Sequence, residues 1–249
     1  MDFNKTYKKA PIIEAIFEVQ IEPHLVDELK QLVPAPLNVA EQYPEIKPIY
    51  TWTQKLKLGS GKLNHEDAEN ELFGYQFWNK EKNQVCQYRK TGFSFSRLAP
   101  YSMWENHFPE FLKRWNEYYA LYKPVKASNI ILRYIDSFDF NETSINLDHY
   151  FNGIPSPPSS LPQNLTGFIF QYSIEPEANI NLHVSITPKK NNSPEKNGQS
   201  IILDTVVSSS SYNLSKPSVI EEVFNKLRIY AVKVFEASIT EQTRRMIDE

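Results

Sequence analysis

Glycine is scarce in this sequence, with 7 residues among 249. Phosphate-cradling loops and dinucleotide-binding turns need backbone positions that glycine alone fills easily, so this scarcity argues against a nucleotide-binding unit of either kind. No stretch resembles a P-loop, an EF-hand, a zinc finger or a kinase signature. The sequence therefore predicts no cofactor, and it offers no catalytic residue by motif.

Cysteine is nearly absent as well. The single Cys86 excludes an intrachain disulfide and a cysteine-rich metal site. Its surroundings, NQVCQYR, favour a small buried residue with an inert thiol over a nucleophile. His65, Glu66 and Asp67 are all metal-ligand types, but the polar stretch NHEDAEN around them is more typical of a solvated loop. We expect no metal site.

Long apolar runs and a strong charge of one sign are also missing. No run approaches the roughly 20 apolar residues of a membrane span, and the start MDFNKTYKK lacks the apolar stretch of a signal peptide. The net charge of −3 indicates no general attraction to nucleic acid or to anionic membranes. The lysines in TPKKNNSPEKNG are typical of a solvated turn. We predict a cytoplasmic protein without a membrane partner.

What the chain does contain is enough apolar material for a core, with 41% hydrophobic and 13% aromatic residues. β-rich patterns predict strands at 11–22, 49–58, 71–79, 83–98, 129–140, 166–176, 179–189 and 199–211. Apolar residues at helical spacing predict helices at 24–32, 102–122, 146–151 and 216–240. Pro109 is expected in the first turns of its helix, and Pro217 at the first helical position of the last one. Proline-rich connections follow the two short helices.

The order of these elements is the same in both halves of the chain. It predicts an α+β fold made of a duplicated β-α-β-β-β-α unit, with the halves at 1–126 and 127–249. Each half is expected to contribute an antiparallel curved sheet with a long helix packed on one face. The two units can also share one continuous sheet. Exposed strand edges such as 166–176 make a homo-oligomer plausible.

Polar residues inside strands are the main candidates for a site. Glu14, Arg133 and Asp136 stand where apolar residues would stabilise more, so each must be paired or solvated. Arg133 and Asp136 point to opposite faces of one strand and cannot pair. The best match between the halves sets Glu14 opposite Arg133, which predicts an ion pair where the halves join. His183 alternates with apolar residues and is expected on a sheet surface.

Three segments, KAPIIEAIFEV, NIILRYID and VFEASIT, resemble those of a sporadically distributed, uncharacterised prokaryotic family of about 250 residues. The matching positions are Pro11, Glu14, Arg133, Tyr134, Phe235, Ile239 and Thr240. Asp136 departs from the asparagine more common in that family. The resemblance covers essentially the whole chain. It implies an accessory gene, such as those of defence or toxin–antitoxin systems, and supplies no activity.

Three functions remain open at this point. The first is a non-catalytic partner-binding or regulatory protein. Glu14 and Arg133 are a candidate structural or functional pair, with the structural interpretation favoured, and Tyr134, Asp136 and His183 are weaker candidates. The second is a small-molecule binder with a cavity between the sheet and a long helix. The third is an enzyme, which the missing motifs disfavour. Aromatic residues also allow base stacking, but their positions on helix stripes and strand interiors favour the core over nucleic acid.

Overall fold

The computed structural model describes residues 6–22, 37–53, 56–59, 62–65, 69–141, 145–155, 157–158, 160–161, 167–189, 198–216 and 218–249. Its strands are β1 (Ile12–Ile21), β2 (Glu45–Thr53), β3 (Leu56–Gly59), β4 (Lys62–His65), β5 (Glu69–Trp78), β6 (Gln84–Arg89), β7 (Gly92–Leu98), β8 (Lys126–Phe140), β9 (Phe170–Glu177), β10 (Ile180–Lys189) and β11 (Gln199–Asn213). Its helices are α1 (Leu37–Gln42), α2 (Trp104–Tyr122), α3 (Leu147–Tyr150), α4 (Ser218–Ser238) and α5 (Glu241–Asp248).

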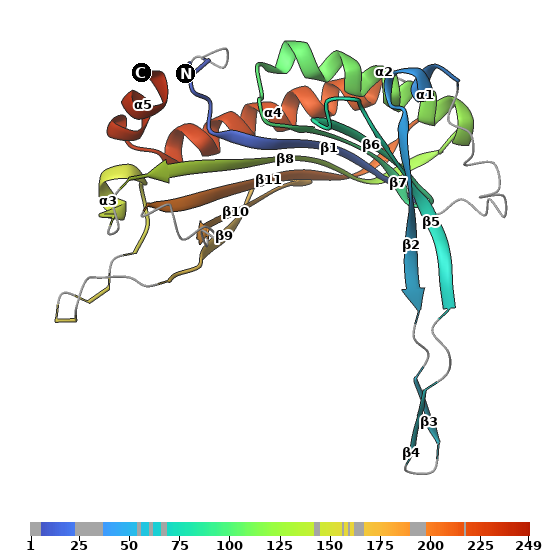
Figure 1. The fold of residues 1–249 in the computed structure, drawn as a ribbon, viewed down its shortest axis with the longest axis horizontal. Coiled ribbons are helices and arrows are strands. Elements are labelled where there is room, and N and C mark those ends of the chain that lie inside the picture. Colours follow the sequence, from blue (N-terminus) through green and yellow to red (C-terminus); the bar gives the residue numbers. More distant parts are fainter. Residues whose placement is uncertain are drawn as a thin grey trace.

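Nine of these strands form a single antiparallel sheet in the order β2-β5-β6-β7-β1-β8-β11-β10-β9 (Figure 1). The predicted duplicated unit is therefore wrong. The strands before and after residue 126 are joined by the pairing of β1 with β8 along most of their length. They contribute unequal numbers of strands to one sheet, and the boundary between the predicted halves falls at the start of β8. Because strand pairing is a long-range contact, a repeated order of elements does not by itself define two units.

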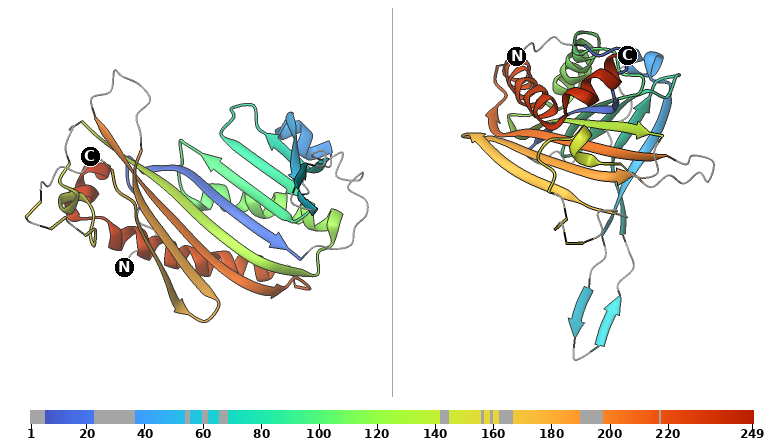
Figure 2. Two further views of the ribbon diagram at one scale, coloured as in Figure 1. Left: turned by 90° about the horizontal axis from the view of Figure 1, so that it is seen from below. Right: turned by 90° about the vertical axis from the view of Figure 1, so that its left-hand side faces the viewer.

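The two long helices, α2 and α4, lie on the same face of this sheet (Figures 1 and 2). Phe17 of β1 illustrates this arrangement, since its ring lies 5.2 Å from Trp104 and Phe111 of α2 and 5.7 Å from Phe224 of α4. The apolar stripes of both helices meet the strands there and make the core. No helix in the described part of the chain has both the length and the apolar character needed to cross a membrane.

Several predicted boundaries need correction. The long helix predicted to end at residue 240 stops at Ser238, and a separate helix, α5, follows after Thr240, whose side chain caps it by accepting from the N–H of Thr243. Pro109 lies in the second turn of α2, within the first turns where it was expected. The predicted helix at 24–32 and Pro217 lie outside the described residues.

The strand predicted at 83–98 is a hairpin, β6 and β7, that turns at residues 90–91. Gly92 has a φ of 145°, a conformation that other residues rarely adopt, and a side chain there would meet the carbonyl oxygen of Val19. The strand predicted at 49–58 ends at Thr53 as β2. Together with β5 it extends away from the helix-covered body, and the small sheet of β3 and β4 continues this arm (Figure 1).

Candidate functional site

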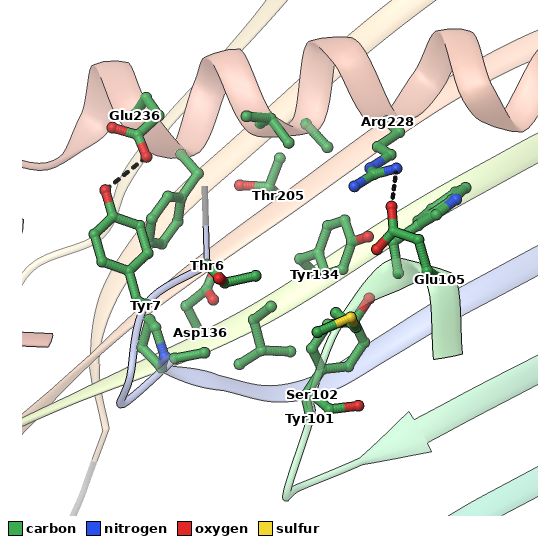
Figure 3. Close-up of a pocket in the computed structure, with 18 residues that line it drawn as sticks. Thr6, Tyr7, Tyr101, Ser102, Glu105, Tyr134, Asp136, Thr205, Arg228 and Glu236 are labelled. Atoms are coloured by element: carbon green, nitrogen blue, oxygen red, sulfur yellow. Dashed lines mark hydrogen bonds and ion pairs between the residues drawn. The ribbon is translucent and has the colours of Figure 1, made fainter. Parts of the chain in front are cut away.

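A cavity of about 140 Å³ lies between the helix-covered face of the sheet and α4 (Figure 3). Its walls come from residues 6–12 of the N-terminal arm, residues 101–105 at the start of α2, strands β8 and β11, and α4. The arm is fixed by a backbone hydrogen bond in which the N–H of Lys9 donates to the carbonyl of Ile247, at 2.9 Å. Segments far apart in the sequence therefore build this one cavity, which opens to solvent on one side.

Asp136 of β8 is a deeply buried acid in this cavity. Side chains alternate along a strand, so Asp136 shares the helix-covered face with Leu132, Tyr134 and Phe138. It is 1% exposed, and its Oδ1 atom has no hydrogen-bond partner. Burial raises the pKa of this carboxyl to about 8, and the charge of Asp204 adds to the rise. Asp136 is therefore mostly protonated at neutral pH.

Thr205 of β11 provides a second buried polar atom without a partner. In the pairing of β11 with β8, Thr205 stands opposite Tyr134 and Leu203 stands opposite Asp136, so Thr205 and Asp136 are diagonal neighbours on one face. The Oγ1 atom of Thr205 is buried and makes no hydrogen bond. Each such atom destabilises the folded state by about 1–3 kcal/mol. Two of them beside one cavity indicate a place for a polar group of a ligand.

Aromatic side chains form much of the wall around these two atoms. The rings of Tyr101 and Tyr134 are perpendicular, with centroids 6.1 Å apart. Burial raises the pKa of Tyr101 to about 12, and burial together with the nearby Tyr101 raises the pKa of Tyr134 well above its ordinary value. Both hydroxyls therefore stay protonated at neutral pH. Trp104 and Phe235 add two further rings.

An ion pair between the two long helices borders the cavity. The Nη1 atom of Arg228 on α4 lies 2.9 Å from Oε1 of Glu105 on α2 (Figure 3). The guanidinium also lies over the ring of Trp104, with 5.0 Å between its central carbon and the ring centroid. Arg228 is thus held by an acid and by an aromatic face at the same time.

A second acid at the other end of the cavity is also neutralised. Glu236 of α4 accepts hydrogen bonds from the Tyr7 hydroxyl, at 2.7 Å, and from Nε of Arg244, at 2.9 Å. Hydrogen bonding ties the arm to α4 at this point (Figure 3). Among the charged side chains that line the described cavity, Asp136 is the one for which no oppositely charged partner is found.

Arg133 and Glu14, the main candidates from the sequence, lie outside this cavity. Arg133 faces the side of the sheet without the long helices and makes a bidentate ion pair with Asp204 of β11, at 2.8 and 2.6 Å. The prediction of a direct ion pair between Arg133 and Glu14 is therefore corrected. Their strands do pair, with Ile16 opposite Arg133. The pKa of Arg133 is raised first by its hydrogen bond to Asp204, and the charge of Glu14 contributes less.

The secondary candidates divide between the two faces. Tyr134 and Asp136 line the cavity. His183 lies exposed on β10, where its Nδ1 atom is 3.0 Å from the hydroxyl of Ser173 on β9. The side chain of His65 and residues 66–67 lie outside the described part of the chain. Cys86 is fully buried, and burial raises the pKa of its thiol, as expected for an inert residue.

Ser102 and His107 form a pair at the edge of the cavity that resembles a nucleophile and its base. The Ser102 Oγ atom lies 3.0 Å from Nε2 of His107. Burial lowers the pKa of His107 to about 4, with a smaller contribution from Arg97, and its Nδ1 atom has no hydrogen-bond partner. Such a ring is a weak base without an orienting acceptor. We assign the pair to fixing the start of α2.

The sequence did not identify three of the cavity residues, Thr205, Arg228 and Tyr101. Thr205 alternates with Leu203 and Val207 and has the pattern of an ordinary strand residue. Arg228 carried a usable signal, because it stands four residues after the buried Phe224 and three before the buried Ala231, at the edge of the apolar side of a helix. Nothing local in the sequence brings these residues together.

Among the described residues, no group of three or more His, Cys, Asp or Glu side chains could hold a metal ion. Comparison with protein-family models, with curated proteins and with solved structures found no match. The candidate site therefore rests on the geometry and chemistry of the cavity.

Proposed function

We propose that this protein binds a small organic molecule in the cavity between α4 and the sheet. The observation that carries the proposal is the pair of buried oxygen atoms, Oδ1 of Asp136 and Oγ1 of Thr205, that lack hydrogen-bond partners beside a largely apolar space with several aromatic rings. Ligand sites are typically apolar cavities with a few converging polar groups and a perturbed pKa. All three features occur together here.

The surrounding residues give each part of a ligand a place. The polar head contacts Asp136 and Thr205, and an apolar body packs against Tyr101, Tyr134 and Phe235. A cavity of this volume is close to the engineered cavity of about 150 Å³ that holds benzene in another protein. A bound molecule would contact the N-terminal arm, α2 and α4 together. This contact suits a regulatory protein that responds to a ligand.

Blocking the cavity tests this proposal. Val232 lines it from α4 and is only half-buried, so Val232→Phe adds bulk there with little damage to the core. The matched control is Val219→Phe, the same change at a half-buried position of α4 outside the lining. A ligand from a library of ring-sized fragments, at 100 times its Kd, should raise the melting temperature by about 5–10 °C in wild type and in the control. Ligands that stabilise Val232→Phe equally would contradict the proposal.

Partner binding is a second candidate function, favoured by the projecting strands β2 and β5. Ile46, Tyr50 and Trp52 occupy alternate positions of β2, on one side of the strand, and are 47%, 50% and 72% exposed. Aromatic residues gathered on a projecting strand are typical of protein contacts. A partner captured from the native host by wild type and lost with the double variant Tyr50→Ser, Trp52→Ser would support this function. Retention by that variant, as by a control Ile229→Ser, would contradict it.

The place of the protein in a cell stays a prediction. We propose a cytoplasmic location, supported by the single cysteine, which excludes an intrachain disulfide. A role in a defence or toxin–antitoxin system rests on the resemblance of the three short segments. The functions of neighbouring genes would test that role.

A further inference from the structure

We infer that the ligand class of this cavity is a small primary amine, bound as its ammonium ion by Asp136 and Thr205. The inference rests on the proposed ligand-binding function. An ammonium group carries three N–H donors and no acceptor. The two partnerless oxygen atoms at the cavity both accept hydrogen bonds, so they match a donor-only head group.

The charges around the cavity favour a cation over an anion. Three acidic side chains line it, Glu105, Asp136 and Glu236, against one basic side chain, Arg228. Arg228 is already paired with Glu105, and Glu236 with Arg244. A carboxylate or phosphate ligand would find no unpaired cation among the described lining residues. An ammonium ion would find in Asp136 the one acid of the described lining that has no basic partner.

The aromatic wall favours the same class. The faces of aromatic rings carry negative electrostatic potential, which attracts a cation within about 6 Å and is strongest where water is excluded. Tyr101, Tyr134 and Phe235 supply three rings to the lining, beside Trp104, whose ring already lies under the guanidinium of Arg228. The volume of about 140 Å³ fits an apolar body of about one six-membered ring or a short branched chain.

Binding an ammonium ion should release a proton. Burial keeps Asp136 mostly protonated at neutral pH, whereas the complex requires its carboxylate. The titratable and charged groups that face the cavity with it are Tyr7, Tyr101, Glu105, Tyr134, Arg228 and Glu236, and Asp204 acts from the other face of the sheet. The tyrosines are protonated and the other lining charges are paired. The released proton therefore comes from Asp136.

Three probes that share a phenyl ring compare a positive, a neutral and a negative head group: benzylamine, benzyl alcohol and benzoate. Isothermal titration calorimetry at pH 7 in two buffers of different ionisation enthalpy measures both affinity and proton release. We expect benzylamine to bind about 10- to 100-fold more tightly than benzyl alcohol, as for hydrogen bonds to charged groups, and benzoate not to bind. Benzylamine should release close to one proton per site, and benzyl alcohol none.

Asp136→Asn should lower the affinity for benzylamine about 10- to 100-fold and leave the affinity for benzyl alcohol nearly unchanged. The control Asp139→Asn makes the same change at an exposed position of the same strand and should alter neither. If Asp136→Asn fails to fold, the proton release of wild type still decides. If wild type binds benzylamine and benzyl alcohol with equal affinity, and Val232→Phe binds neither, the inference of an amine ligand is overturned while the proposed ligand-binding function stands. Absence of amine binding would also overturn the inference, and the fragment screen judges the function separately.

Discussion

The buried acid at the cavity makes a specific prediction about stability against pH. An aspartate whose pKa rises on folding holds its proton more tightly in the folded state than in the unfolded state. For Asp136 the pKa rises from 3.8 to about 8. The stability it contributes is fully present below pH 3.8 and is lost as the pH rises through about 8. Between these values the free energy of unfolding should fall by about 1.4 kcal/mol per pH unit.

Asp136→Asn isolates this effect, because an asparagine stays neutral at every pH. The shift of roughly four pKa units corresponds to about 6 kcal/mol over the whole range. Urea unfolding at pH 5, 6, 7, 8 and 9 gives the free energy of unfolding of both proteins. The variant should gain about 4 kcal/mol on wild type between pH 5 and pH 8 and little beyond pH 9.

The matched control is Asp139→Asn, the same change at an exposed position of β8. It leaves Asp136 intact, so its curve should run parallel to that of wild type. If the curves of Asp136→Asn and wild type were also parallel, Asp136 would not change its protonation on folding. The argument that its carboxyl is a neutral, unpartnered group in the folded protein would then fail.

Three further predictions concern charged and thiol groups elsewhere. A double-mutant cycle on Arg133 and Asp204, measured by urea unfolding, should give a coupling energy of about 0.5–1 kcal/mol, because the Arg133 side chain is 40% exposed. The same cycle on Arg133 and Glu14 should give a much smaller coupling energy. Arg114→Ala should destabilise by about 3–5 kcal/mol, since it leaves the acidic partners of a fully buried guanidinium unpaired, and thermal unfolding checks this. Cys86 should react with a thiol reagent only after unfolding, and rapid labelling of the native protein would contradict its burial.

Local periodicity predicted most elements well. The apolar stripe of α4 at Ile220, Val223 and Leu227 is buried as its helical spacing requires, and the strand predicted at 129–140 lies within β8. These successes depend on contacts between near neighbours in the sequence. The turn at residues 90–91 interrupts the apolar pattern with the polar run at 89–92, and Gly92 marks its end, so the sequence did carry a signal for this hairpin.

Long-range pairing was the part that the sequence left open. The repeated order of elements suggested two units, but β1 and β8 pair with each other and merge all nine strands into one sheet. The cavity is equally non-local, because Thr205 and Arg228 come from segments that show ordinary strand and helix patterns. The sequence analysis singled out Arg133 as the arginine among apolar residues. Among the described residues, however, the fully buried guanidinium is that of Arg114 on α2, which helical spacing alone did not distinguish from surface residues.

The alternation along β8 nevertheless held the main clue. Arg133 and Asp136 lie on opposite faces, so one strand carries a partly exposed ion pair on one side and an unpaired acid on the other. The two sides remain coupled, because the charge of Asp204 raises the pKa of Asp136. Arg133 neutralises Asp204 and so limits that rise. Arg133 lies outside the cavity, yet its removal should raise the pKa of Asp136 further and make its proton harder to release.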